Sequence, residues 1–371
     1  MKVWLLLSRL EHGGLERVQL NLAKAMHVRG VDVSLVAGQV IADTHQELPP
    51  ALPVLEVAKA GPAFFPFGLL RALCRERPDF VFTTSNDVAC LMVLLRIVLF
   101  RRMHVVVAQH LSLSGPRDSA RGVQRIKLVF TLKAMRALVR RAYRVIAVSQ
   151  GVADDMVREL RVGKSQIRVI YNPIVTPEFE ARMQEVPIWP WPDHAVPTII
   201  YVGRLSAEKR LDLLLESFQA LIRHTPARLL IVGNGPLQSS IEDGIAACGL
   251  EAHCYLTGFV SNVLPLIRKA AVLVLPSDYE GFGNVLVEAM ACGTQVIATD
   301  CPHGPAEILD NGKFGQMVPM NDPSALEAAI HRCLDGRVHV PAAALKARAR
   351  EFELDAIVDR YLAILSAGPM S

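Results

Sequence analysis

The sequence predicts an α/β protein of two domains, each a parallel β-sheet covered by helices. Apolar runs of strand length alternate with helical patterns along the chain, which is typical of parallel sheets. With 371 residues and 51% hydrophobic content, the chain is long enough to bury two cores. The stretch 186–197 holds four prolines and can continue neither helix nor sheet. We therefore predict an N-terminal domain at 1–185, a linker at 186–197, a C-terminal domain at 198–345 and a terminal helical segment at 346–371.

Each domain shows the expected alternation of strands and helices. The strands expected in the first domain are 2–7, 31–37, 78–83, 104–108, 143–148 and 166–171. Those expected in the second domain are 198–202, 229–232, 255–260, 271–275 and 295–298. Helical patterns occupy 16–29, the segment that ends at 160, 284–292, 324–334 and 343–366. Several strands are continuous apolar runs, as expected for strands that are buried on both faces.

Composition argues against several classes of protein. The seven cysteines are odd in number and scattered, without a C-x-x-C pair, so neither a disulfide framework nor a zinc site is expected. A reduced, intracellular protein fits this usage best. The apolar run after Lys2 is too short for a signal peptide and ends in Arg9, so we expect a first strand there. The longest apolar run, 88–100, contains Arg96 and falls short of the roughly 20 residues that span a bilayer.

Positive charge is concentrated in one segment. The whole chain carries a net charge of +4, whereas nine Lys or Arg residues and one Asp give the segment 117–144 a net charge of +8. Arg117, Arg121 and Arg125 recur at helical spacing, and apolar residues such as Ile126 and Phe130 could form the other face. Such a helix fits an anionic membrane surface, and a solvated basic face is the alternative. No nucleic-acid partner is expected, because base-stacking aromatics are not interleaved with the cations.

The richest chemical pattern follows the strand at 271–275. The strand leads into a loop with Gly281 and Gly283, where the backbone can turn sharply and approach a ligand. A helical pattern begins at Asn284. The N-terminus of a helix presents free N–H groups and roughly half a positive charge, so this loop suits a phosphate.

Two carboxylates bracket this loop. Glu280 lies at the carboxyl end of the strand, where open α/β sheets bind ligands, and it could accept hydrogen bonds from hydroxyl groups. Glu288 lies about one turn inside the helix, where it could bind a second pair of hydroxyls, such as those of a ribose. The alternative is that both are ordinary surface glutamates.

Two further loops of the second domain could meet an anionic ligand. Arg204 and Lys209 follow the first strand of this domain, and two cations there could neutralise a departing diphosphate. A solvated loop is the alternative. The strand 229–232 runs into Gly233 and Gly235, but the third glycine of a dinucleotide fingerprint is missing, so a nicotinamide site is poorly supported.

The first domain offers weaker candidates. Gly13 and Gly14 stand between a strand and a helix, an arrangement that suits phosphate but is also a common packing unit. His110 follows the strand 104–108 at a sheet's carboxyl edge, although a lone histidine is more often structural. Three phenylalanines within 61–68 could contact a membrane or an acceptor, or pack beneath their loop.

Two of these segments resemble motifs of one enzyme family. EGFGNVLVEAMACG, from Glu280 to Gly293, resembles the E-x7-E donor motif of the family 4 retaining glycosyltransferases. GRLSAEK, from Gly203 to Lys209, resembles the phosphate-clamping motif of that family. The resemblance spans nearly the whole chain and implies the GT-B fold, in which two Rossmann-like domains face each other across a deep cleft. It also implies that the last helix crosses back onto the first domain.

The resemblance implies a role for each candidate. Catalytic roles, at the donor sugar or its departing β-phosphate, are implied for His110, Arg204, Lys209 and Glu280. Donor binding is implied for Gly13, Gly14, Gly203, Gly233, Gly235, Phe259, Val260, Gly281, Phe282, Gly283, Asn284, Val285 and Glu288. Among these, Glu288 would hold the ribose, and the main chain at 259–260 would meet the base.

The expected reaction is a retaining transfer of a hexose or N-acetylhexosamine from a nucleotide sugar. We find no D-x-D pair for a metal, and cations with helix amides can replace one, so no cofactor is expected. UDP is favoured over GDP, because DCPHGPAEIL resembles the matching segment of bacterial enzymes that use UDP-sugars. The expected acceptor is a glycolipid, a polyprenyl-diphosphate-linked glycan or a lipopolysaccharide. The protein is expected in the cytoplasm, peripheral on the inner face of the membrane.

Three other functions remain open. The same fold hosts nucleotide-sugar 2-epimerases, which need additional acid/base residues. A binding protein without catalysis is disfavoured because Arg204, Lys209, Glu280 and Glu288 are all present. An NAD-dependent oxidoreductase is disfavoured by the incomplete glycine fingerprint.

Overall fold

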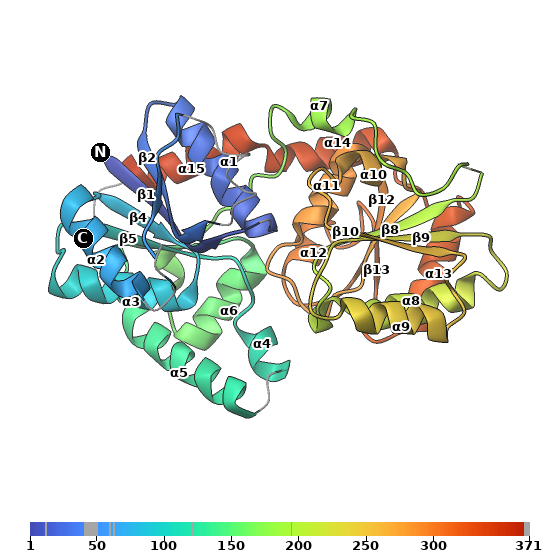
Figure 1. Ribbon diagram of the computed structural model, residues 1–371, viewed down its shortest axis with the longest axis horizontal. Coiled ribbons are helices and arrows are strands. Elements are labelled where there is room, and N and C mark those ends of the chain that lie inside the picture. Colours follow the sequence, from blue (N-terminus) through green and yellow to red (C-terminus); the bar gives the residue numbers. More distant parts are fainter. Residues whose placement is uncertain are drawn as a thin grey trace. The chain divides into compact units, whose positions relative to one another are not determined.

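The computed structural model of the chain describes residues 1–11, 13–40, 51–58, 61, 64–119, 122–193 and 195–366. The chain divides into two compact units. Unit 1 comprises Met1–Pro173 and Leu354–Ser371, and unit 2 comprises Ile174–Glu353. Each unit has a central sheet with helices on both faces (Figure 1).

Unit 1 contains a seven-stranded sheet in the order β3-β2-β1-β4-β5-β6-β7, and all of its strands are parallel. These strands are β1 Lys2–Leu10, β2 Asp32–Val40, β3 Val54–Glu56, β4 Phe80–Thr83, β5 His104–Gln109, β6 Arg144–Ala147 and β7 Ile167–Val169. The strand order reverses between β1 and β4. The loops after these two strands therefore form the switch point at which such sheets bind ligands.

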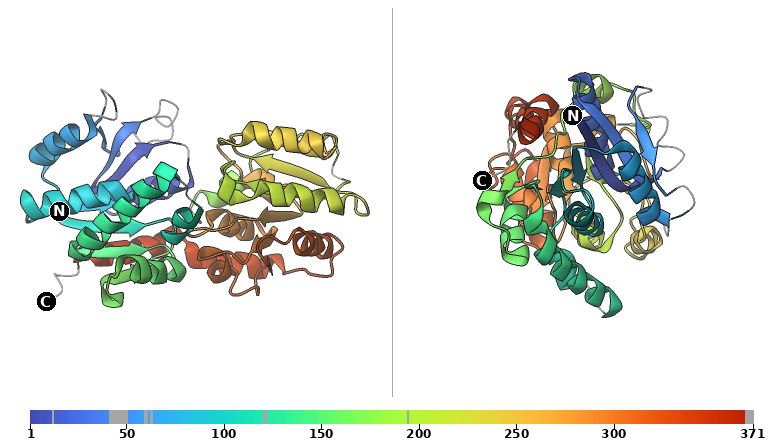
Figure 2. Two further views of the ribbon diagram at one scale, coloured as in Figure 1. Left: turned by 90° about the horizontal axis from the view of Figure 1, so that it is seen from below. Right: turned by 90° about the vertical axis from the view of Figure 1, so that its left-hand side faces the viewer.

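The helices of unit 1 are α1 Gly14–Val28, α2 Phe65–Glu76, α3 Asn86–Val98, α4 Ser114–Ser119, α5 Gly122–Leu138, α6 Gln150–Leu160 and α15 Leu354–Ser366. Helices α1 and α15 contact each other, and Val3 and Leu5 of β1 share a core with them. Trp4 and Leu6 alternate with these residues and are buried on the opposite face. Figure 2 shows unit 1 from two further directions, with α15 in red and α5 in teal-green.

Unit 2 repeats this plan with a six-stranded sheet in the order β10-β9-β8-β11-β12-β13, again all parallel. Its strands are β8 Thr198–Val202, β9 Arg228–Val232, β10 Cys254–Gly258, β11 Val272–Leu275, β12 Gln295–Thr299 and β13 Gln316–Val318. Its helices are α7 Phe179–Met183, α8 Leu211–Leu221, α9 Gln238–Ala247, α10 Leu264–Lys269, α11 Asn284–Cys292, α12 Gly304–Ile308, α13 Pro323–Leu334 and α14 Ala342–Ala349. Here the order reverses between β8 and β11, so the loops after these strands form the switch point of unit 2.

The limits of the units differ from the domain limits expected from proline content. Unit 1 ends at Pro173 rather than 185, because the amides of Ile174 and Val175 already donate to the carbonyl of Phe352 in unit 2. The proline-rich stretch 186–197 lies inside unit 2 and not between the units.

The C-terminal helical segment is not one continuous helix. The pattern 343–366 predicts a single helix, but a 3-10 turn at Arg350–Phe352 and an extended residue, Glu353, separate α14 from α15. The chain enters unit 1 at Leu354, eight residues after the expected start of the terminal segment at 346.

Candidate active site

A buried ion pair joins the two loops at the switch point of unit 2. Lys209, after β8, places its Nζ 2.5 Å from Oε1 of Glu280, after β11. Only 18% of the lysine side chain and 11% of the glutamate side chain are exposed. Burial disfavours the charged ammonium, but the charge and hydrogen bond of Glu280 outweigh it and raise the pKa of Lys209. Lys209 therefore remains a cation at neutral pH.

Ser277 fixes the carboxylate of this pair. Its hydroxyl, which is fully buried, donates to Oε1 of Glu280 at 2.7 Å. The hydroxyl of Thr299 in turn donates to the Ser277 carbonyl at 2.5 Å. The Glu280 carboxylate thus has a defined position before any ligand binds. The sequence analysis did not select Ser277 as a site residue. Its position at a strand end, three residues before Glu280, was a signal that could have identified it.

Arg204 supplies a second cation on the loop after β8, which also carries Lys209. Its side chain is exposed, and no ion pair is found for it in the described part of the chain. The buried hydroxyl of Tyr201 donates to the Arg204 carbonyl at 2.9 Å, which holds the backbone of this loop. Arg210, by contrast, already pairs with Asp212 and Asp278. Arg204 is therefore available to an anionic ligand.

Gly233 and Gly235 allow the loop after β9 to pack directly on the loop after β8. A Cβ atom at Gly233 would lie 2.0 Å from the carbonyl oxygen of Gly203. One at Gly235 would lie 2.4 Å from that of Leu205. Because backbone atoms stand in the way, no larger residue fits at either position. Backbone packing accounts for these glycines, and their contact with a donor stays a prediction.

Helix α11 begins at the same loop as Glu280. Gly283 has a φ of 101° and provides no side chain to cap the helix, so the helix N-terminus carries its partial positive charge. The preceding Phe282 is buried, and a Cβ atom at Gly304 would lie 1.6 Å from its carbonyl oxygen. Asn284 and Val285, in the first turn, are half-buried. The half-buried Glu288 lies one turn further along the helix.

The loop after β10 borders the glycine loop after β9. The amide of Gly233 donates to the carbonyl of Gly258 at 2.8 Å. Phe259, which follows, is 44% exposed. The main chain at 259–260 therefore lies near the candidate donor-binding loops of unit 2.

His110, Gly13 and Gly14 belong to unit 1, whereas the other candidates lie in unit 2. His110 follows β5 and is buried, and its Nε2 lies 3.4 Å from Nε2 of Gln19. Burial lowers the pKa of His110 to about 4, although a hydrogen bond with Asn172 opposes the change. At pH 7 His110 is therefore a neutral hydrogen-bonding group and not a cation.

Gly13 and Gly14 lie at the switch point of unit 1. Gly13 is the N-cap of α1, and Gly14 is the first residue of the helix. A Cβ atom at Gly13 would lie 2.2 Å from Oε2 of Glu16. This carboxylate lies in the first turn of α1, where it suits the helix dipole.

The neutral state of His110 predicts a loss of stability in acid. Between pH 6.5 and pH 4 the unfolded chain binds a proton at His110 that the folded chain does not. The free energy of unfolding must therefore fall as the pH falls through this window, by about 3 kcal/mol in all. Melting temperatures measured from pH 7 to pH 4.5 should drop less steeply in His110→Gln than in the wild type. Equal slopes would contradict this account of His110.

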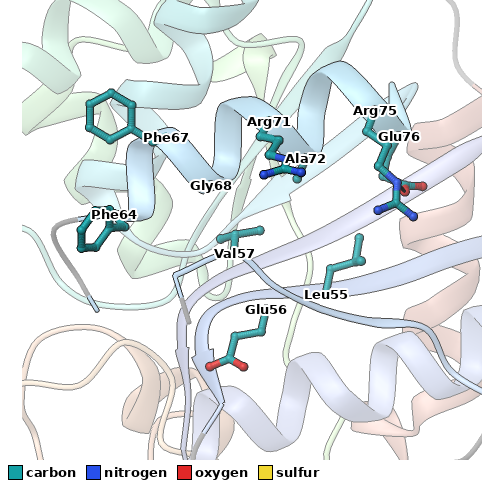
Figure 3. A pocket seen from close by; sticks show the side chains of 10 residues that line it. All are labelled: Leu55, Glu56, Val57, Phe64, Phe67, Gly68, Arg71, Ala72, Arg75 and Glu76. Carbon is teal, nitrogen blue, oxygen red and sulfur yellow. Dashed lines mark ion pairs between the residues drawn. The ribbon is translucent and has the colours of Figure 1, made fainter. Parts of the chain in front are cut away.

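An open hollow of about 460 Å³ lies beside α2 in unit 1. Leu55 and Val57 line it from the edge of the sheet, and Phe64, Phe67 and Arg71 line it from the helix side (Figure 3). Phe64 and Phe67 are 55% and 75% exposed. Two of the three phenylalanines of this segment therefore do not pack beneath their loop.

The basic segment forms helix α5 in part. Arg121 and the side chain of Arg117 lie outside the described residues. Ile126 and Phe130 are 59% and 67% exposed, on the same helix as the exposed Arg125 and Lys133. Nζ of Lys133 lies 5.9 Å from the ring centre of Phe130. Apolar and cationic side chains thus share the exposed surface of α5.

The described residues contain neither a metal-binding cluster nor a helix able to cross a membrane. Within them, no three or more His, Cys, Asp or Glu side chains are grouped so that they could hold a metal. In the same part of the chain, no helix combines the length and the apolar character needed to cross a bilayer.

Two family models match the chain. One, described as "Glycosyltransferase Family 4", matches residues 12–178, and the other, "Glycosyl transferases group 1", matches residues 196–336. Together they span most of both units.

Similar proteins include several transferases. A lipopolysaccharide 1,6-galactosyltransferase of Escherichia coli K12 is 27% identical over 60% of this chain and 61% of its own length. A Campylobacter jejuni N-acetylgalactosaminyltransferase, named for a diphospho-undecaprenol substrate, is 27% identical over 52% of this chain and 50% of its own. The first eight relatives are all matched over less than two thirds of their length.

Solved structures with the same fold match over nearly the whole chain. Anabaena HepE, solved in complex with UDP, has a TM-score of 0.79 at 20% identity and covers 99% of this chain and 100% of its own. A sucrose-phosphate synthase of Thermosynechococcus elongatus has a TM-score of 0.81 at 21% identity, with the same coverage. By its two family matches the chain belongs to the family 4 glycosyltransferases, and the solved structures show that it has the GT-B fold.

Proposed function

We propose that this protein is a retaining, metal-independent transferase that moves a hexose or N-acetylhexosamine from a UDP-sugar to a lipid-linked or lipopolysaccharide glycan. The observation that carries the proposal is the Lys209–Glu280 pair at the switch point of unit 2. Arg204 and the N-terminus of α11 lie on the same two loops. One site thus combines two cations and a helix dipole with a fixed carboxylate.

This arrangement suits the departure of a nucleoside diphosphate. An ammonium has three N–H donors, and Glu280 uses one of them, so Lys209 keeps donors for a phosphate. Arg204 and the helix dipole add to the stabilisation of the charge that develops as the glycosidic bond breaks. Glu280, held by Ser277, would accept hydrogen bonds from the sugar hydroxyls. Glu288 would hold the ribose.

Relatives support the choice of donor and acceptor. HepE was solved with UDP and with UDP-glucose. The Campylobacter jejuni relative is named for an undecaprenol-linked acceptor, and the Escherichia coli relative for lipopolysaccharide. We extend both features to this chain, with a cytoplasmic location on the inner face of the membrane.

Arg204→Ala tests the proposed function. Turnover of UDP-sugar with acceptor should fall by about 10²-fold or more, because one cation at the leaving group is lost. The melting temperature should stay unchanged, because Arg204 is exposed. Arg223→Ala, which removes another exposed arginine of unit 2, is the matched control and should keep full turnover. Normal turnover in Arg204→Ala would contradict the proposal, and an epimerised nucleotide sugar without transfer would favour the 2-epimerase.

Flotation with vesicles tests the membrane location. Binding through α5 should require anionic lipid, because the exposed cations Arg125 and Lys133 lie on the same helix as Ile126 and Phe130. The double variant Ile126→Asp, Phe130→Asp should float less than the wild type. Flotation that is absent, or indifferent to lipid charge, would count against the membrane location.

A further inference from the structure

The proline-rich stretch of unit 2 exposes two large apolar side chains. Val186 and Ile188 are each 94% exposed, more than any other large apolar side chain among the described residues. We call residues 186–191 the apolar loop. Pro187 and Pro190 each fix their own backbone dihedral φ, which lowers the entropy lost when the loop is ordered.

Trp191 anchors the apolar loop to the sheet of unit 2. The ring of Trp191 contacts Tyr255 on the edge strand β10, with 6.3 Å between ring centres. Arg228 lies 5.2 Å from the ring centre of Trp191 and pairs with Asp193 at 3.0 Å. Packing against the sheet edge therefore explains Trp191, but it does not explain Val186 or Ile188.

Cations lie beside the exposed part of the loop. Nζ of Lys269, the last residue of α10, lies 5.0 Å from the ring centre of Trp189. Its neighbour Arg268 donates to the side chain of Gln184, just before the loop. Tryptophan is enriched at membrane–water interfaces, and lysine can lay its aliphatic stem along apolar groups while its ammonium stays at the surface.

We propose that the apolar loop inserts at the boundary between the headgroups and the acyl chains of an anionic membrane, with Ile188 and Val186 among the acyl chains and Lys269 at the phosphates. This inference rests on the membrane location proposed above, and it assigns a membrane contact to unit 2. It is independent of α5, which lies in unit 1.

Two other occupants fit the observations less well. Two aliphatic side chains cannot supply the roughly 800 Å² per partner that a stable protein interface buries. A sugar chain stacks best on coplanar rings, but Trp189 and Trp191 meet at 68° and Trp191 and Tyr255 at 67°. Stacking of a sugar on the rings would also leave Val186 and Ile188 uncovered. A lipid surface accepts them without a matching partner shape.

Tryptophan fluorescence tests the proposal directly. The chain has three tryptophans, and the third, Trp4, is buried in unit 1 with no exposed surface. With phosphatidylglycerol vesicles, the emission of the full-length protein should shift to shorter wavelength. Lipids brominated in their acyl chains should quench it. Helix α5 contains no tryptophan, so binding through α5 alone would float the protein without this quenching.

Ile188→Asp supplies the matched comparison. It should lower the partition into these vesicles by about tenfold or more, because one apolar anchor is lost. Val28→Asp changes an apolar residue that is 85% exposed in unit 1, and it should keep the quenching. Both variants should keep the wild-type melting temperature and the stabilisation by UDP. Because UDP stabilisation is measured without vesicles, a wrong assignment of the donor site would be distinguished from a wrong assignment of the apolar loop.

Three outcomes would overturn the proposal. The first is flotation without quenching by brominated lipid. The second is quenching that persists in Ile188→Asp at the wild-type level. The third is an emission shift produced by a soluble oligosaccharide and not by vesicles, which would assign the loop to glycan binding.

Discussion

Replacing Lys209 with alanine is expected to lower turnover by about 10²–10³-fold, because the cation nearest the departing phosphate is lost. The variant should also be less stable. Without the lysine, the Glu280 side chain, which is only 11% exposed, has no charged partner. This should lower the free energy of unfolding by about 1–3 kcal/mol. Arg204→Ala, in contrast, should lose turnover without losing stability. Steady-state kinetics and thermal melting of the two variants measure both effects.

A double variant separates the two roles of Lys209. Lys209→Ala combined with Glu280→Gln removes both charges, so much of the lost stability should return while turnover stays low. Near-normal turnover in Lys209→Ala would show that the lysine only supports the fold.

Glu280→Gln is expected to lower turnover by about 10²-fold or more while UDP binds at least as tightly as before. The amide keeps the size of the side chain but loses the charge that pairs with Lys209. The lysine is then free to meet the diphosphate, whereas the sugar loses its charged acceptor. Glu216→Gln, at an exposed position on α8, is the control and should leave both quantities unchanged. Turnover within a few-fold of wild type, or weaker UDP binding, would contradict the role given to Glu280.

The local pattern of the sequence was enough to predict most of the elements that carry the site. The apolar run before Glu280 is β11, and the helical pattern from Asn284 is α11. The three-residue strands β3 and β13 were not predicted, because so short a run has no distinct period.

The ion pair itself could not be read from the sequence. Lys209 and Glu280 are 71 residues apart, and they meet only because β8 and β11 are neighbours in the sheet. Strand order is a property of the whole unit. The local pattern could therefore predict a cation in one loop and a carboxylate in another, but it could not predict that they form an ion pair. The same limit applies to Thr299, whose contact with Ser277 depends on the position of β12.

The proline-rich stretch shows a different limit. Proline content correctly indicated that the described residues of 186–197 form neither helix nor strand. It could not show which unit the stretch packs on, because this depends on the distant partners Arg228 and Tyr255. Local pattern alone therefore does not separate a linker from a segment that is anchored to unit 2.

The most direct test of the central claim is a thermal-shift measurement with UDP, GDP, ADP and NAD, each with EDTA and with magnesium, on the wild type and on Glu288→Ala. At 100 times its dissociation constant, UDP should stabilise the wild type by about 2.7 kcal/mol. The effect should be the same with EDTA and weaker in Glu288→Ala. Stabilisation by NAD alone, or only with magnesium, would contradict a metal-independent UDP-sugar site at the loops after β8 and β11.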